Sequence, residues 1–163
     1  MKRRSVIRGL GLAGLGLAGM GQAQSTPGHA IVLSGGEIVP TAVDTPALAV
    51  VRVETDGRVL HIRGAVANLS GAFRDYTRDP VDDPALNARL TSAIHLHRGP
   101  KGQNGPLLQA LKAVYGPDGR SATFVDRLEL SPEDQARLRQ GELYFDIHTA
   151  LFRAGEIRGQ ILL

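Results

Sequence analysis

The sequence predicts an all-β fold, an antiparallel Greek-key sandwich or barrel with one short helix near residues 132–140. Short apolar runs separated by turn residues recur along the chain from about residue 30, a spacing typical of β-sandwiches and barrels. The strongest hairpin signal, Asp56-Gly57, lies between two of these runs. The chain has 163 residues, 42% of them hydrophobic, so we expect one β domain over residues 24–163 with its own core.

The expected strands are short and are bounded by glycine, proline and aspartate residues. In chain order they cover residues 30–33, 47–54, 58–65, 92–97, 107–114, 122–128, 143–149 and 156–163. The last two are expected to pair as a hairpin around Ala154-Gly155. The helix over residues 132–140 is expected because Ser131 is a good N-cap residue, Pro132 suits the first helical position and Gly141 ends the pattern.

Residues 1–23 have the pattern of an export signal, with a basic start, a glycine-rich apolar stretch and small residues before a cut after Ala23. The run from Arg3 to Arg8 resembles the twin-arginine pattern, and ordinary secretion is the alternative. The apolar stretch is too short and too weakly apolar for a membrane span, which needs roughly 20 apolar residues. We therefore expect a periplasmic or secreted protein without a membrane span.

The excess of positive charge in the chain comes from this leader. The full sequence has 19 basic and 16 acidic residues, a formal net charge of +3, and four of the basic residues and none of the acidic ones lie in residues 1–23. Removing the leader leaves 15 basic against 16 acidic side chains, a net charge of −1. With three Tyr and four Phe for stacking, we expect no nucleic-acid partner.

Residues 73–90 form a polar insertion between two apolar runs. Four aspartates alternate there with three arginines and two prolines, which predicts a solvated loop with paired charges. Asp83-Pro84 could cap a short helix over residues 85–90. A calcium loop is the alternative, but the insertion lacks the regular ligand alternation and the closing glutamate of such loops.

Three histidines occupy positions that could bind a metal ion. His95 and His97 are two residues apart on an expected strand, so both imidazoles leave the same face. Tyr144, Asp146 and His148 share one face of another expected strand. If these strands are neighbours, three imidazoles converge, and three such ligands with an open fourth position suit zinc or copper. Surface or hydrogen-bonded histidines are the alternative, and His61 is a candidate fourth member.

Several motifs occur in an order that resembles the chordin-type (CHRD) domain. The resemblance covers residues 29–163 and is carried by the segments 33–40, 69–71, 94–99, 102–108, 138–149 and 155–161. It implies an all-β fold of the kind found in the extracellular antagonist chordin and in exported microbial proteins. The His-x-His and His-Thr motifs of that domain match His95, His97 and His148 here.

The resemblance also extends the set of candidate site residues. Asp146 stands where the family often has Asn, and it could be a fourth ligand or could accept a hydrogen bond that orients an imidazole. His61, Glu156 and Arg158 are further candidates for supporting the histidines without binding the metal themselves, although Glu156 and Arg158 also suit a structural ion pair or hydrogen bonds to a loop. The insertion at 73–90 looks long for the family and ends just before His95, which suggests a lid.

Together these observations favour an exported CHRD-domain binding module that holds a copper or zinc ion through three histidines, or binds an extracytoplasmic protein or small ligand. One alternative is a copper-dependent redox enzyme resembling Cu/Zn superoxide dismutase, which also carries a His-x-His on a β-barrel. Against it, this chain lacks the second dense set of histidines and has no cysteine. The other alternative is a purely structural or protein-interaction domain without metal. We assign no catalytic residue.

Overall fold

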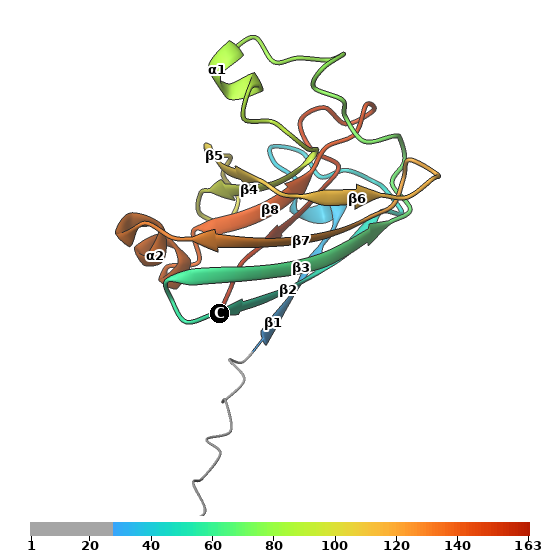
Figure 1. The fold of residues 1–163 in the computed structure, drawn as a ribbon. Helices are drawn as coiled ribbons and strands as arrows, with labels where there is room; N and C mark the ends of the chain where they lie inside the picture. The colour runs from blue at the N-terminus through green and yellow to red at the C-terminus, as the bar shows by residue number, and fades with distance from the viewer. Residues whose placement is uncertain (1–27) are drawn as a thin grey trace, which may run out of the picture.

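The computed structural model describes residues 28–163, and the predicted export signal at 1–23 lies outside them. Two antiparallel sheets face each other (Figure 1). The five-stranded sheet has the order β1 (Gly28–Leu33), β2 (Leu48–Thr55), β3 (Val59–Ala67), β7 (Ala122–Glu129), β6 (Ala113–Tyr115). The four-stranded sheet has the order β5 (Leu107–Ala110), β4 (Ile94–Arg98), β8 (Leu143–Ile147), β9 (Ile157–Gln160). The predicted antiparallel sandwich is confirmed, and the described chain forms no closed barrel.

Local sequence signals explain where these elements begin and end. The β2–β3 hairpin turns at Asp56-Gly57 as predicted: the Asp56 carboxylate accepts hydrogen bonds from the backbone N–H groups of Arg58 and Val59 at 2.8 and 2.9 Å, and Gly57 has φ +88°. Helix α2 (Pro132–Arg139) begins after Ser131, whose hydroxyl accepts from the Asp134 N–H at 3.1 Å. Both predictions are confirmed.

Two elements differ from the sequence-based expectation. Residues 107–114 form two strands in different sheets, because the chain crosses the sandwich at Leu111 and buries that side chain completely in the core. The periodicity of an apolar run does not show such a crossing, since both strands and the crossing residue are apolar. The short helix α1 (Pro84–Asn87) is capped by Asp83 but ends three residues earlier than expected.

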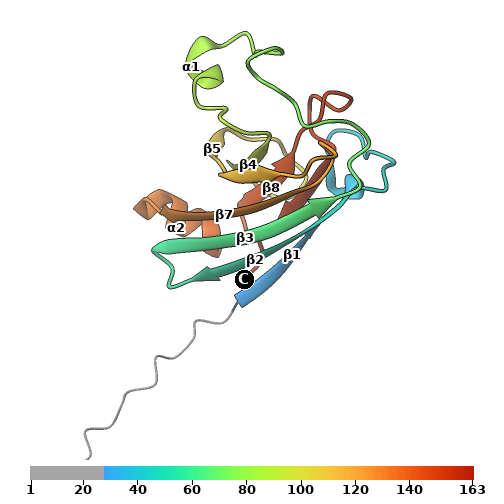
Figure 2. The ribbon, with the colours of Figure 1, turned by 45° about the vertical axis from the view of Figure 1, so that its right-hand side comes forward.

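The two sheets are covered differently on their outer faces. Their inner faces form one core, to which β8 contributes Phe145 and Ile147. Every residue of β8 is buried, so the outer face of the four-stranded sheet is covered as well, while alternate residues of β2 are exposed on the other sheet. The insertion with α1 projects from the sandwich beyond β4 and β5, and the 3₁₀ turn η1 (Gly35–Glu37) follows β1 (Figures 1 and 2). Within residues 28–163 no helix is long and apolar enough to cross a bilayer.

Glu156 fastens three of the connecting loops to one another. Its side chain is completely buried and accepts hydrogen bonds from the hydroxyls of Thr45 at 2.6 Å and Thr149 at 2.8 Å, and from the backbone N–H of Ser70 at 2.7 Å. Burial opposes its charge, but these hydrogen bonds outweigh burial and lower the pKa of Glu156. The carboxylate is therefore a structural anchor rather than a free acid.

Replacing Glu156 by Gln is expected to lower the free energy of unfolding by roughly 1–3 kcal/mol at pH 7, because a hydrogen-bonded buried anion is lost. The folded-state pKa is lowered, so the carboxylate stabilises the fold above its unfolded pKa of about 4.3 and this stabilisation disappears as pH falls through the folded pKa. Urea denaturation at pH 7 and pH 3 should show the difference between wild type and Glu156→Gln shrinking in acid. The exposed Glu129→Gln is the control, and a gap that widens in acid would contradict the assignment.

Candidate metal centre

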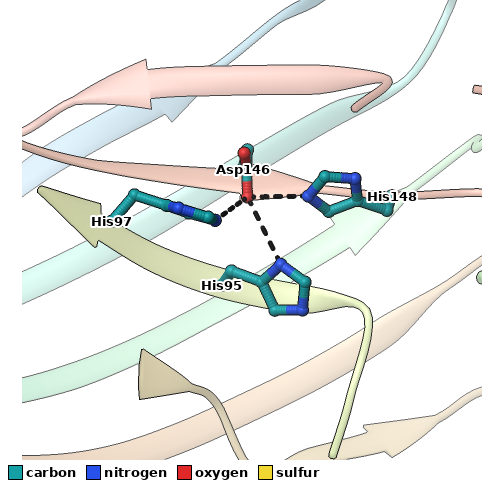
Figure 3. A group of neighbouring side chains, drawn as sticks. All are labelled: His95, His97, Asp146 and His148. Carbon is teal, nitrogen blue, oxygen red and sulfur yellow. Dashed lines mark ion pairs between the residues drawn. The ribbon is translucent and has the colours of Figure 1, made fainter. Parts of the chain in front are cut away.

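Four side chains meet on the outer face of the four-stranded sheet: His95, His97, Asp146 and His148 (Figure 3). The register of β4 and β8 places His95 opposite Asp146, and His148 follows β8 directly. Strand alternation sends Ile94 and Leu96 into the core and both histidines of β4 to the other side. The strands that the sequence predicted to carry these residues are thus neighbours.

The four side chains converge on one small space. The carboxylate oxygen Oδ1 of Asp146 lies 3.1 Å from His148 Nε2, 3.2 Å from His97 Nε2 and 3.8 Å from His95 Nδ1. The four candidate ligand atoms all lie within 4.8 Å of one another. Little water reaches them, because the most exposed of the four side chains, His97, is only 14% exposed.

Backbone carbonyls fix the tautomer of every imidazole. His95 Nε2 lies 2.8 Å from the carbonyl of Ser92, His97 Nδ1 lies 3.0 Å from that of Gly105, and His148 Nδ1 lies 2.9 Å from that of Arg153. A carbonyl only accepts hydrogen bonds, so in each ring this nitrogen carries the hydrogen. The other nitrogen of each neutral ring therefore turns a lone pair toward Asp146.

This arrangement leaves four buried polar atoms without a hydrogen bond: His95 Nδ1, His97 Nε2, His148 Nε2 and Asp146 Oδ1. Lone pairs that face a carboxylate oxygen in a dry site repel one another, and each unsatisfied buried group costs roughly 1–3 kcal/mol. A proton on one ring satisfies only one of the three nitrogen–oxygen contacts. A single cation among the four atoms satisfies all of them at once.

The electrostatics of the cluster favour positive charge close to the Asp146 carboxylate. Burial, followed by the charge of the neighbouring His148, lowers the pKa of His95 to about 3. Burial also opposes a charge on His148, but the Asp146 carboxylate outweighs it and raises the pKa of His148. Burial likewise opposes ionisation of Asp146, yet His148 and then His97 hold the pKa of Asp146 well below its usual range. The carboxylate therefore stays ionised beside a neutral His95.

The distances also fit the size of a first-row metal ion. Zinc bonds to imidazole nitrogen and carboxylate oxygen at about 2.0–2.1 Å, so neighbouring ligand atoms of a zinc tetrahedron lie about 3.3 Å apart. The three contacts of Asp146 Oδ1 at 3.1, 3.2 and 3.8 Å bracket that value. The residues present thus fit a four-coordinate ion in donor type and number, and the contacts of Asp146 Oδ1 also fit it in spacing.

A stack of side chains holds His97 in place. The His97 ring lies parallel to the Tyr144 ring with an interplanar angle of 8° and a centroid distance of 5.1 Å. The Arg158 guanidinium lies over the Tyr144 ring, 3.5 Å from the ring centroid. It also donates a hydrogen bond to the carbonyl of Gln103 at 2.6 Å. The loop that supplies the Gly105 carbonyl is thereby fixed to β8 and β9. The sequence placed Tyr144 on the face of Asp146 but gave no sign of this stack.

The insertion at 73–90 reaches the cluster from outside. Tyr76 is buried against His95 with a centroid distance of 5.7 Å, and the Arg74 guanidinium lies over the Tyr76 ring. Arg74 also donates to the Arg153 carbonyl, the same oxygen that accepts from His148. Asp79 forms ion pairs with both Arg74 and Arg153. The segment therefore packs against the cluster at His95 and is tied to the loop that supplies the Arg153 carbonyl.

Two other candidate residues lie elsewhere. His61 is on β3, in the opposite sheet, and its side chain is exposed. Glu156 binds the loops around Thr45, Ser70 and Thr149 and forms no side-chain hydrogen bond or ion pair with the cluster. Among the residues expected to support the histidines, Arg158 acts through Tyr144, and Asp146 itself belongs to the converging group.

A small antiparallel sandwich that buries a three-histidine, one-aspartate cluster beneath its own loops belongs to the all-β binding or interaction modules. The chain is a member of the CHRD domain family, whose model matches residues 30–161, most of the chain. Comparisons with curated proteins and with solved structures gave no match. Family membership thus rests on a match that includes the cluster and its loops.

Replacing Gly105 by Ala tests the support of His97. A Cβ atom at Gly105 would collide with the backbone carbonyl of Arg98, so the loop must move and the carbonyl that binds His97 must move with it. We expect a loss of about 1–3 kcal/mol in the free energy of unfolding, measured by urea denaturation. The control is Gly36→Ala, where the nearest atom is a flexible Ser34 hydroxyl at 3.8 Å. Equal stability of the two variants would refute the close packing.

Proposed function

We propose that this chain is an exported binding module that holds one copper or zinc ion through His95, His97 and His148, with Asp146 as the fourth ligand. The single observation that carries this proposal is the convergence of four buried ligand atoms that have no hydrogen-bond partner. Export is supported by the twin-arginine-like leader at residues 1–23, and a CHRD domain suits a binding role.

The ligand set favours copper or zinc over other cations. Calcium takes six to eight oxygen ligands and magnesium keeps several waters, whereas three imidazoles and one carboxylate suit zinc(II) and copper(II). The ligands are buried, which protects a bound ion from exchange with solvent. When bound, such an ion would supply positive charge that joins β4, β8 and the loop after β8 into one unit.

The arrangement supports binding without turnover. A catalytic zinc site keeps one position open for water or substrate, while a site with four protein ligands is closed. Asp146 stands where an open position would be needed, so a redox enzyme is not the function we propose. If copper is bound and superoxide is consumed at a rate that follows copper content, the enzyme alternative replaces the closed-site proposal.

Metal analysis of the mature protein, purified without a histidine tag, tests the proposal. We expect close to one copper or zinc ion per chain in the wild type. His148→Ala should lose most of it, because the remaining ligands no longer enclose the ion, and an affinity loss of at least about 100-fold is expected when a direct ligand is removed. His61→Ala is the matched control, since it removes an exposed histidine of the other sheet.

Equal metal content in His148→Ala and His61→Ala would place any bound metal on the surface and refute the site. Absence of metal from the wild type, even after dialysis against zinc or copper and removal of the excess, would leave an interaction domain without metal. Circular dichroism of each variant keeps a folding defect separate from a binding defect.

The insertion is expected to slow metal exchange, and Asp79→Asn tests this. The substitution removes ion pairs to Arg74 and Arg153, which hold the segment over the cluster. A loss of roughly 1 kcal/mol in that closure corresponds to about fivefold faster zinc transfer to a chromogenic chelator. Asp82→Asn, an exposed position of the same segment, should exchange at the wild-type rate. If both variants release zinc at one rate, the segment is not the barrier.

A further inference from the structure

We propose that the bare outer face of the five-stranded sheet docks an acidic protein whose contact surface combines carboxylates with apolar side chains. We call this surface the outer sheet face and define it by four cationic and four apolar residues: Arg52, Arg63, Lys112, Arg127, Val32, Val50, Val114 and Val125. It lies on the sheet opposite the histidine cluster, and the inference is independent of metal binding.

The cationic half of this face surrounds a hollow of about 310 Å³. Four basic side chains line it together with two acidic ones, Glu54 and Asp126, so its formal charge is +2 with neutral His61. Residues 24–163 as a whole carry a net charge of −1. The positive charge is thus a local feature of one surface, and a surface of this kind attracts acidic partners and speeds their association.

Strand register brings the like charges together. Arg52 lies directly opposite Arg63. Like charges at directly opposed positions destabilise a sheet. Arg52 and Arg127 are paired with Glu54 and Glu129, but neither Arg63 nor Lys112 forms an ion pair with any residue in 28–163. Two cations are therefore left for an external carboxylate.

An apolar row crosses the sheet beside these charges. Register connects Val32, Val50, Ala65, Thr123 and Val114 in one line from β1 to β6. The valines of this row are 55%, 47% and 74% exposed, and Val125 beside Arg63 is 60% exposed. With Leu48, this face carries five of the nine large hydrophobic side chains that are exposed in residues 28–163. Such a concentration is typical of a protein-binding surface.

The combination selects the partner. A second copy of the chain in a symmetric contact would bring the same positive hollow against itself, which like charges oppose. A polysaccharide or a small anion has no apolar surface to bury against the valine row. Membrane-binding surfaces insert clusters of protruding aromatic and leucine side chains, whereas four of the five exposed apolar side chains on this face are short valines. An acidic and partly apolar protein surface satisfies both halves.

The test uses a fluorescein-labelled random copolymer of glutamate and tyrosine, with poly-glutamate of the same length for comparison. Fluorescence anisotropy at low salt should show the copolymer binding at least about threefold more tightly, because its rings bury apolar area on the valine row. The double variant Arg63→Glu, Lys112→Glu should weaken both polymers about tenfold or more, since attraction becomes repulsion. Val50→Ser should abolish the preference for the copolymer.

A control is Arg139→Glu, an exposed arginine on α2 that undergoes the same change of charge as each single substitution of the double variant, and it should bind like the wild type. Unchanged thermal unfolding shows that each variant is folded. Three outcomes would overturn the proposal: heparin binding as tightly as the copolymer with no effect of Val50→Ser, binding to anionic phospholipid vesicles that Val50→Ser weakens, or a dimer of the free protein that Arg63→Glu dissociates. Equal loss of binding in Arg139→Glu would show a general charge effect and would also refute it.

Discussion

Three imidazole nitrogens face one carboxylate oxygen in a space that water hardly enters, and much of the surrounding structure serves this contact. Each imidazole needs a backbone carbonyl to hold its hydrogen, and the three carbonyls come from three different loops. Those loops must therefore be rigid. Arg158 and Tyr144 fix the loop before β5, and Arg74 and Asp79 fix the loop after β8. Support of this kind orients metal ligands and is as much a part of a site as the ligands.

The sequence predicted the sandwich and the residues that converge because both follow from alternation within single strands. The period of two puts His95 and His97 on one face of β4, and Asp146 and His148 on one face of the segment that begins with β8. The pairing of β4 with β8 then brings the two pairs together. Other features depend on contacts between distant segments. The crossing at Leu111, the stack on Tyr144 and the cover by Tyr76 join residues far apart in the chain, and a single sequence carries no signal for them. The exposed place of His61 was equally hidden, because its strand could have belonged to either sheet.

The two outer faces of the sandwich divide the molecule into different environments. One face is covered by the chain's own loops and holds ionisable groups away from water. The other face has no cover in the described chain and carries valines beside arginines. Because the chain's own loops cover the first face, its side chains have a fixed geometry and are shielded from solvent. Because the second face is exposed, its arginines and valines are available to an external partner.

The alternation along β8 gives the cluster a role in the assembly of the protein. Phe145 packs into the core while Asp146, its neighbour, reaches the histidines on the other side. A slip of one residue would turn the carboxylate into the hydrocarbon interior and push the aromatic ring among the imidazoles. Misaligned pairing of the two central strands would thus be penalised twice, so the polar cluster selects a single native alignment during folding.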